Sequence, residues 1–553
     1  METTAFDLLD EPWIRVMTHD RQIRELSLTQ ALLQSHEYRR LAGELPTQDV
    51  AILRLLLAVL HTVFYRVDLD GADDPIEERG QALARWRALR QAGRLPEGPI
   101  RAYLEHWHDR FWLFHPERPF YQVPGADVGT LYKAQKLNGE LSESSNKPRL
   151  FPVRAGAAKE RLTYAEAARW LVTMMGFDDV STKVETGTGI GWLGQHIDLY
   201  AVGDNLFETL LLNLAFLKDG KIVWEEKNVP AWEKDPAKTA KKKKIAVPGD
   251  QAGLLTLQSR RTILVRDGDM VIGCHTTGGD YFGEDGAAAA SNEQMTQWIK
   301  DPKAKKGVPR FIPRSPCADR AMWRDYETIV DKRQGQVPIP GIMAWLQRLR
   351  EKGLLPNRTI RLSSVGIVYD KKKSSAADIV SDHLDFHAAL LNEAGTLWND
   401  LVGRKIGEID KAAEQVALLA ERLFRAGGGQ PGSPAQDARK EQAKQEFYAA
   451  VDIPFRQWLY SLDPEQGDGE ELRAEKDAQW REKAYRIALR QGRGMVDRAG
   501  TPAFVGRWVK KEGKKAKKDE KEFYASPIAL DRFVFGIGKL FAIENRKKEG
   551  QTE

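Results

Sequence analysis

The hydrophobic pattern of this 553-residue chain changes near residue 376, and this change constrains the fold more than any other feature. Beyond it, the sequence is dominated by Ala, Leu, Glu, Arg and Lys at helical spacing, with short breaks such as GGGQPGSP at 427–434. Amphipathic helices joined by short breaks are typical of a helix bundle. We therefore predict an α+β fold, with a large mixed N-terminal domain at residues 1–375 and a C-terminal helix bundle at 376–553. The predicted bundle helices cover residues 379–403, 405–425, 435–462, 470–493 and 524–545.

Helical and alternating patterns are mixed in the N-terminal part. An apolar helix from Thr47 to Tyr65 is predicted to lie in the core, and residues 254–274 are predicted to form two strands that turn at Asp267-Gly268. Residues 222–250 carry a lysine run and are predicted to be an exposed insertion. The segment YDKKKSS at 369–375 follows a strand pattern, so we predict a β-hairpin or projecting turn there.

A glycine-rich loop follows a helix that has a clear start signal. Thr163 and Glu166 have the spacing of a capping box, and the helix is predicted from Leu162 to Met175. The loop contains G-x-G-x-x-G, but a dinucleotide fingerprint needs a strand before it and a helix after it, and here the order is reversed. The loop is either a structural surface loop or a binding loop, since long irregular loops in compact domains are usually functional. Its glycines are Gly187, Gly189, Gly191 and Gly194.

Positive charge is clustered along the chain. The net charge is only 84 − 79 = +5, yet residues 234–244 hold six lysines, residues 510–521 hold seven, and a run of three lysines begins at Lys371. A single lysine run is usually a solvated face. Several such runs in one chain favour a nucleic acid or another polyanion as a partner.

Catalytic and metal-binding motifs are missing from the sequence. It has no Walker A motif, no H-E-x-x-H and no C-x-x-C, and two cysteines are too few for a disulfide framework or a four-cysteine zinc site. His106, His108 and His115 fit packing or capping roles better than a metal site, and the pair Asp178-Asp179 fits a loop or helix cap better. No uninterrupted apolar run approaches the roughly 18 residues of a membrane span. We predict a cytoplasmic protein that is not an enzyme, needs no cofactor or metal and has no membrane partner.

Five segments together point to a known family. They are FDLLDEPWIRV at 6–16, NKPRLF at 146–151, GDNLFETLLLNL at 203–214, RSPC at 314–317 and the helical C-terminal third. In this order they resemble the large subunit (CasA) of the type I-E CRISPR surveillance complex, Cascade. The resemblance implies a non-catalytic subunit of an RNA-guided DNA surveillance complex. It would recognise the protospacer-adjacent motif (PAM) in duplex DNA, help to open the duplex for R-loop formation and recruit the helicase-nuclease that degrades the target.

The resemblance also implies partners and positions. The implied partners are crRNA, double-stranded target DNA, the helicase-nuclease, and the backbone, small and 5′-handle-binding subunits of Cascade. Contact with the guide RNA and a backbone subunit is implied at Asn146, Lys147, Arg149 and Phe151. DNA and PAM contact is implied at Val180, Ser181, Thr182, Lys183, Lys303 and Lys305. A wedge in the duplex is implied at Lys371, Lys372, Lys373 and Ser374.

This chain departs from the family pattern at three points. Where the family has a glycine loop, it reads FDDVSTK at 177–183. Where the best-known member has a glutamine in the wedge turn, it reads YDKKKSS. It also lacks the cysteine cluster that holds zinc in some members. Because the minor groove displays a degenerate code, a small loop reading it is expected to tolerate several PAMs.

Two other classes of function fit the residues alone. The basic clusters are compatible with a generic nucleic-acid-binding subunit of a ribonucleoprotein unrelated to CRISPR, whose binding would not depend on a short duplex motif. The glycine loop and Asp178-Asp179 are compatible with an enzyme of unrecognised type, which would turn over nucleotide or cleave DNA by itself.

Overall fold

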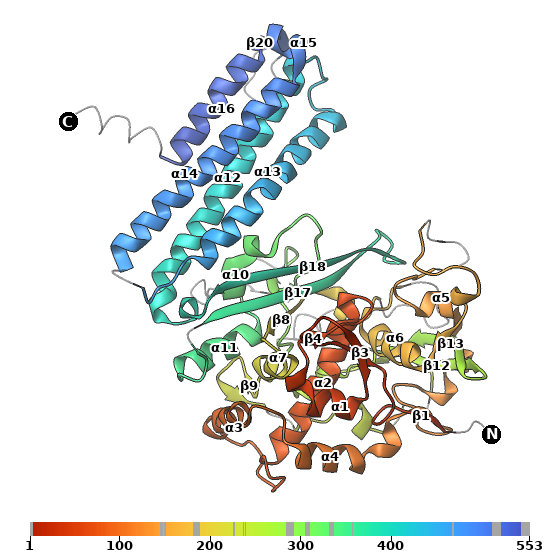
Figure 1. The fold of residues 1–553 in the computed structure, drawn as a ribbon. Coiled ribbons are helices and arrows are strands. Elements are labelled where there is room, and N and C mark those ends of the chain that lie inside the picture. Colours follow the sequence, from red (N-terminus) through yellow and green to blue (C-terminus); the bar gives the residue numbers. More distant parts are fainter. Residues whose placement is uncertain are drawn as a thin grey trace. The chain divides into compact units, whose positions relative to one another are not determined.

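The computed structural model describes residues 4–542 apart from short internal gaps, and these residues form two compact units (Figure 1). The first comprises Met1–Met322, Thr328–Pro356 and Ile360–Leu384, and the second comprises Trp323–Glu327, Asn357–Thr359 and Asp385–Glu553. The gaps are 144–147, 149–150, 181–188, 225–226, 236, 238, 284–291, 305–309, 331–336, 357, 467–468 and 511–520.

The first unit mixes short helices with several small sheets, as the α+β prediction requires. Its helices are α1 (Leu28–Leu33), α2 (Pro46–Arg66), α3 (Arg79–Ala92), α4 (Glu97–His106), α5 (Ala134–Leu137), α6 (Tyr164–Phe177), α7 (Leu206–Asn213), α8 (Gln251–Leu255) and α11 (Gly341–Glu351). The short helix α10 (Tyr326–Val330) straddles the division between the units.

The sheets of the first unit are nearly all antiparallel. Two three-stranded sheets have the orders β3 (Ile23–Leu26), β2 (Ile14–Met17), β4 (Arg40–Leu41) and β18 (Ala376–His387), β17 (Thr359–Tyr369), β8 (Asp198–Val202). A four-stranded sheet joins β12 (Arg260–Asp267), β13 (Met270–Gly278), β6 (Thr130–Lys133) and β7 (Leu162–Thr163). The remaining pairs are β1 (Ala5–Asp7) with β5 (Trp112–Phe114), β9 (Leu217–Lys218) with β10 (Ile222–Val223), parallel β11 (Lys243–Lys244) with β14 (Asp280–Tyr281), and β15 (Trp298–Lys300) with β16 (Phe311–Pro313).

Helix α2 is the centre of the first unit, which confirms the predicted core helix. Every residue from Val50 to Tyr65 is buried, because apolar side chains surround the helix on all sides. By length and composition alone α2 could cross a membrane, but 94% of its most apolar stretch is buried inside the protein. Such burial is what a core helix needs, and α6, α7 and α8 all pack against it.

The predicted strand pair at 254–274 is confirmed in part. β12 and β13 pair in antiparallel register and turn at Asp267-Gly268, where Gly268 has a φ of 62° that suits glycine. The first residues of the predicted range instead form α8. The prediction that 222–250 is an exposed insertion is wrong in part: Lys241, Lys243 and Lys244 are exposed, but the segment buries Trp224 and Trp232.

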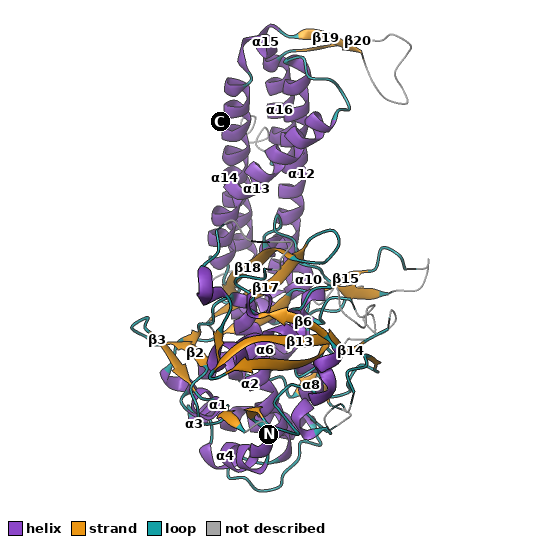
Figure 2. Cartoon of the chain, turned by 90° about the vertical axis from the view of Figure 1, so that its right-hand side faces the viewer, coloured by secondary structure: helices purple, strands orange, loops and turns teal. Residues whose placement is uncertain are grey.

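The second unit is a bundle of long helices that run side by side (Figures 1 and 2). They are α12 (Thr396–Ala426), α13 (Pro434–Tyr460), α14 (Gly469–Arg498) and α16 (Ser526–Leu540), with the short α15 (Gly500–Val505) and the hairpin β19 (Arg507–Lys510) and β20 (Lys521–Tyr524). The helical C-terminal region is thereby confirmed.

The start of the predicted bundle is wrong at one element. Residues 379–387 were predicted as helix, but they belong to β18, whose alternating Leu384 and Phe386 are buried. The first bundle helix begins only at Thr396. Residue 376, where the domain boundary was predicted, is the first residue of β18, and the division between the units falls near the end of this strand, at Leu384.

Candidate nucleic-acid interface

Helix α6 fixes where the candidate loop begins. Its capping box is present as predicted: the Glu166 amide donates to Thr163 Oγ1 (3.2 Å), and the Thr163 amide donates to Glu166 Oε2 (2.9 Å). Every residue from Ala167 to Phe177 is buried. The helix is therefore a rigid support, and the chain leaves it at Asp178.

One buried arginine holds both ends of the loop that follows. Nη2 of Arg260, on β12, donates to the carbonyl oxygens of Asp178 (3.1 Å), Asp179 (2.8 Å) and Gly189 (3.0 Å). Its Nε pairs with the Asp178 carboxylate. Only 1% of Arg260 is exposed, so these contacts form away from water, where charge-assisted hydrogen bonds are strong. The Arg260 side chain therefore ties the two ends of the loop to each other.

The glycines at the exit of the loop allow close backbone approach. The Gly191 amide donates to the Asp178 carbonyl (2.8 Å), and a Cβ at Gly191 would lie 2.2 Å from the Gly176 carbonyl oxygen. A Cβ at Gly194 would lie 2.5 Å from the Tyr369 hydroxyl. A helix precedes this loop and strand β8 follows it, as predicted, so these glycines serve packing and do not open a phosphate-binding helix.

The acidic pair in the loop is neutralised by cations. Asp178 pairs with Arg260, and Asp179 pairs with Lys136 from α5. Within the described ranges, no group of three or more His, Cys, Asp or Glu side chains could hold a metal ion. His115 accepts hydrogen bonds from two backbone amides, which is a capping role as predicted, whereas His108 instead pairs with Asp7.

The tip of the β17–β18 hairpin is shaped by Asp370. Its carboxylate accepts hydrogen bonds from the Ser374 amide (2.8 Å), the Ser374 hydroxyl (3.0 Å) and the Ser375 hydroxyl (2.9 Å). The Lys373 amide donates to the Asp370 carbonyl (2.8 Å), and Lys373 has a φ of 55°. Because polar side chains and backbone shape the turn, the side chains of Lys371, Lys372 and Lys373 remain exposed.

Two hydrogen bonds join this turn to the candidate loop. The Val180 amide donates to the Lys373 carbonyl (2.9 Å), and the Tyr369 hydroxyl donates to the Phe177 carbonyl (2.5 Å). Burial raises the pKa of Tyr369 above its ordinary value, which keeps the hydroxyl protonated as a donor. The structure therefore brings together two segments that lie about 190 residues apart in the sequence, as the separation of Tyr369 and Phe177 shows.

A buried ionic cluster fastens the same region to the core helix. Arg54 of α2 binds both carboxylate oxygens of Glu293 (2.9 and 2.8 Å), and Glu293 also accepts from Trp192 Nε1 (3.1 Å) at the loop exit. Arg54 Nη1 lies 3.5 Å from Asp198 Oδ1 at the start of β8. Burial alone would raise the pKa of Glu293, but the Arg54 guanidinium lowers it to about 2. Burial lowers the pKa of the neighbouring His196 to about 4.

Lys303 and Phe151 are the other predicted residues that the structure describes. Lys303 is exposed on the turn after β15, with its amide bonded to Asp301 Oδ1 (2.8 Å), and Phe151 is 93% exposed. The remaining predicted positions lie outside the described residues: Ser181, Thr182, Lys183, Lys305, Asn146, Lys147 and Arg149.

Sequence reasoning missed Arg260 and Tyr369, which organise this region. The only available signals were a pair of arginines at the start of a predicted strand and a tyrosine at the end of another. Neither pattern reveals partners that are 82 and 192 residues away.

The chain is similar in sequence to CRISPR-associated Cse1 proteins. The family model of CRISPR-associated protein Cse1 matches residues 7–491. The CRISPR-associated protein CasA/Cse1 of Thermus thermophilus is 31% identical over 338 residues, which are 60% of this chain and 61% of that protein. The aligned part therefore spans about three fifths of that relative's length.

Solved structures of similar proteins cover nearly the whole chain. Cse1 of Thermobifida fusca is 27% identical with a TM-score of 0.79, over 98% of this chain and 99% of that one. A chain from a CRISPR RNA-guided surveillance complex has a TM-score of 0.65 and 18% identity, over 97% of this chain and 100% of that one. At this identity the second similarity concerns the fold alone.

Proposed function

The chain belongs to the CRISPR-associated Cse1 family, and we propose that it is the non-catalytic large subunit of an RNA-guided DNA surveillance complex. In this role it recognises the PAM in duplex DNA, helps to open the duplex for R-loop formation and recruits a helicase-nuclease. Guide RNA pairing reads the target sequence in such a complex, so the protein has to read only a short duplex motif.

One observation carries the proposal: the lysine turn and the start of the loop after α6 are bonded to each other. The Val180 amide and the Lys373 carbonyl make this contact (2.9 Å). A loop that reads the PAM and a turn that separates the adjacent base pairs must act on neighbouring steps of one duplex. Their direct contact supplies that proximity.

The chemistry of the two segments suits the two tasks. Unstacking a base step costs a few kcal/mol, and the three exposed cations of the turn offset part of this cost by attracting phosphates. Such contacts position the protein without reading sequence. The sequence of the loop supplies the small polar residues Ser181 and Thr182, which suit base-edge contact in the narrow minor groove.

Attachment to the rest of the complex is proposed at the loop that precedes α6. Phe151 is almost fully exposed there, beside the basic sequence NKPR. An exposed aromatic ring next to cations suits a surface that meets both RNA and a neighbouring subunit. The crRNA, the other Cascade subunits and the helicase-nuclease are accordingly the proposed partners.

The decisive experiment measures the affinity of the reconstituted complex for matched targets with permissive and non-permissive PAMs. Replacing Ser181 or Thr182 by a bulky residue should reduce the ratio between the two affinities, with each base-edge contact worth about 1–3 kcal/mol. Replacing Lys303 or Lys305 should weaken binding to all duplexes similarly and flatten the salt dependence. If the loop variants keep the wild-type ratio, PAM reading belongs elsewhere in the chain.

Two alternatives have distinct outcomes. A generic ribonucleoprotein subunit would bind duplexes equally whatever their PAM. An enzyme would turn over nucleotide or cleave DNA as the isolated chain, and its proposed acidic pair would have to act while bound to Arg260 and Lys136. This ion pairing disfavours a catalytic role for Asp178 and Asp179.

A further inference from the structure

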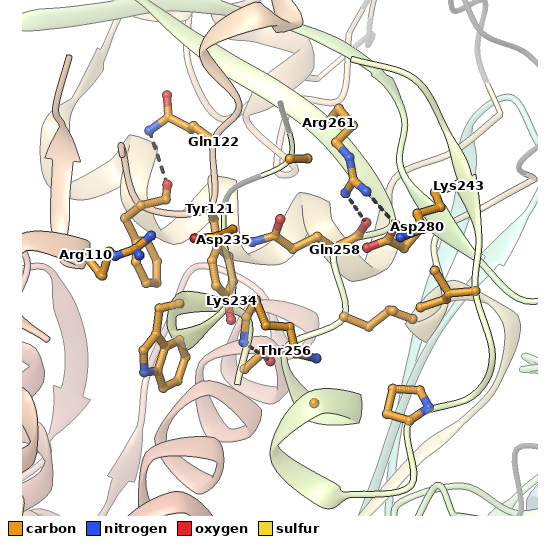
Figure 3. Close-up of a pocket in the computed structure, with 18 of the residues that line it drawn as sticks. Arg110, Tyr121, Gln122, Lys234, Asp235, Lys243, Thr256, Gln258, Arg261 and Asp280 are labelled. Atoms are coloured by element: carbon orange, nitrogen blue, oxygen red, sulfur yellow. Dashed lines mark hydrogen bonds and ion pairs between the residues drawn. The ribbon is translucent and has the colours of Figure 1, made fainter. Parts of the chain in front are cut away.

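A polar cavity of about 720 Å³ lies in the first unit (Figure 3), and none of the described residues that line it belongs to the loop or the turn described above. Its walls come from residues 118–122, from residues 231–250 and from the start of β12. Ligand sites in proteins typically enclose about 300–1,000 Å³, so this volume fits a ligand much larger than a single inorganic anion.

The lining of the cavity carries an excess of positive charge. Six cationic side chains line it: Arg110, Arg118, Lys234, Lys241, Lys243 and Arg261. Three acidic residues also line it, and two of them are already engaged. Asp250 accepts from the amides of Gly253 (2.6 Å) and Val229 (3.1 Å), and Asp280 pairs with Arg261. The formal charge of the lining is therefore 6 − 3 = +3.

Three of these cations have no counter-ion within the described part of the chain. Among the residues that the structure describes, Lys234, Lys241 and Lys243 form no ion pair and no side-chain hydrogen bond. Their backbone is nevertheless held in place: Lys243 lies in β11, which pairs with β14, and Ala240 packs against Val123 and Ala126. Like charges that share a cavity repel one another, and a bound anion removes this repulsion.

Arg261 adds a buried donor to the exposed lysine side chains. It is 4% exposed, and its two terminal nitrogens bind the Asp280 carboxylate and the Gln258 carbonyl (3.4 Å) as it reaches into the cavity (Figure 3). Its Nε has no hydrogen-bond partner in the described part of the chain. A buried donor without a partner is costly, so a ligand that accepts from it gains affinity.

Apolar side chains also line the cavity. The rings of Phe120 and Tyr121 stack with centroids 4.3 Å apart, and both residues line the cavity together with Trp232 and Ile245. Tyr121 has a φ of 55°, a backbone conformation that is uncommon for a non-glycine residue. The cavity thus combines cationic groups with aromatic and aliphatic surface.

We propose that this cavity binds a nucleoside phosphate, either as a free nucleotide or as the phosphorylated end of a nucleic-acid strand. The phosphates would meet the lysines and Arg261, and the base would lie against the apolar part of the lining. This site is separate from the proposed PAM-reading loop. If the cavity does not bind a nucleotide, the proposed function is unaffected. If the proposed function is wrong, the nucleotide site can still exist.

The test is isothermal titration of the full chain, purified free of nucleic acid. The probes are ATP, AMP, inorganic phosphate, and a tetranucleotide with either a 5′-phosphate or a 5′-hydroxyl. We expect saturable 1:1 binding of ATP or of the 5′-phosphorylated tetranucleotide. The first result identifies a free nucleotide and the second a strand end. The double variant Lys241→Gln/Lys243→Gln should weaken the binding by at least about tenfold, since charge-assisted hydrogen bonds to phosphate are lost.

A matched variant controls for net charge. Lys221→Gln/Lys352→Gln removes two exposed lysines that do not line the cavity, and it should bind as the wild type does. Arg261→Lys, which keeps the charge but alters the donor geometry, should also weaken binding. The proposal is overturned if no probe binds saturably at millimolar concentration or if both double variants lose affinity equally. Binding of inorganic phosphate as tightly as ATP would also overturn it.

Discussion

At the scale of single residues, Arg260 contacts more parts of the candidate interface than any other side chain described above. It binds four carbonyl oxygens and one carboxylate, and three of these carbonyls belong to the two ends of the loop, so its replacement affects both ends together. Lysine cannot reproduce a planar group that serves several acceptors. We predict that Arg260→Lys lowers the free energy of unfolding of the first unit by about 1–3 kcal/mol.

Urea unfolding followed by tryptophan fluorescence measures this difference. Arg87→Lys, on α3, is the matched control, because Arg87 is exposed. We expect that control to change stability by less than about 0.5 kcal/mol. Equal effects of the two substitutions would show that Arg260 is not a special anchor.

A separate prediction concerns His61 and the loss of stability at acidic pH. Burial in α2 lowers its pKa from 6.5 to about 3, so the unfolded chain takes up a proton near pH 6.5 that the folded chain refuses. The free energy of unfolding is therefore not reduced by His61 above pH 6.5, and it falls as the pH drops from 6.5 toward 3. Between pH 7 and pH 5 the wild type should lose about 2 kcal/mol more than His61→Gln does.

Each protein is compared with itself at the two pH values, so that the packing cost of the substitution cancels and only the titration of His61 remains. Unfolding free energies are measured for both proteins at both pH values. His196 remains in both proteins and contributes equally. Identical losses in wild type and variant would mean that His61 is accessible to protons in the folded state.

At the scale of elements, the β17–β18 hairpin makes the clearest functional prediction. Replacing its three tip lysines should slow R-loop formation on linear duplex by more than on a target with a pre-opened bubble, because only the first requires unstacking. The design Lys371→Ser, Lys372→Ser, Lys373→Asn respects the positive φ of Lys373, which asparagine tolerates. Equal slowing on both substrates would show that the turn only contacts phosphates.

A second prediction at the scale of elements concerns the hydrogen bond between the β17–β18 hairpin and α6. Tyr369→Phe removes the hydroxyl that donates to the Phe177 carbonyl and leaves the ring in place. A hydrogen bond of this kind contributes about 1 kcal/mol. Hydrogen exchange at the Val180 amide, which is bonded to the turn, should then be faster by roughly fivefold. Unchanged exchange would mean that the turn is held without Tyr369.

Elements also show how far the sequence could be interpreted. The capping box of α6 and the apolar pattern of α2 are local signals, and both were predicted correctly. Residues 379–387 of β18 were predicted as helix because polar residues obscure an alternation that only Leu384 and Phe386 complete by burial. The partners of Arg260 and of Tyr369 could not be predicted, since long-range pairing leaves no local pattern in one sequence.

At the scale of the whole molecule, assembly into a complex can be tested with one exposed ring. Phe151→Ala should lower retention of the subunit on the reconstituted complex during gel filtration, since truncating a buried aromatic anchor costs about 2 kcal/mol or more. Val153→Ala is the matched control, because Val153 lies two residues away and is 65% exposed. Retention of both variants at the wild-type level would remove Phe151 from the interface.

The construction of the hairpin tip also has an evolutionary consequence. Asp370, Ser374, Ser375 and backbone atoms hold the turn, so the side chains at 371–373 contribute little to folding. Substitutions there can accumulate without loss of stability, provided that position 373 tolerates a positive φ. These three side chains can therefore change without loss of folding, so selection on whatever the turn contacts can act on them while the rest of the protein stays the same.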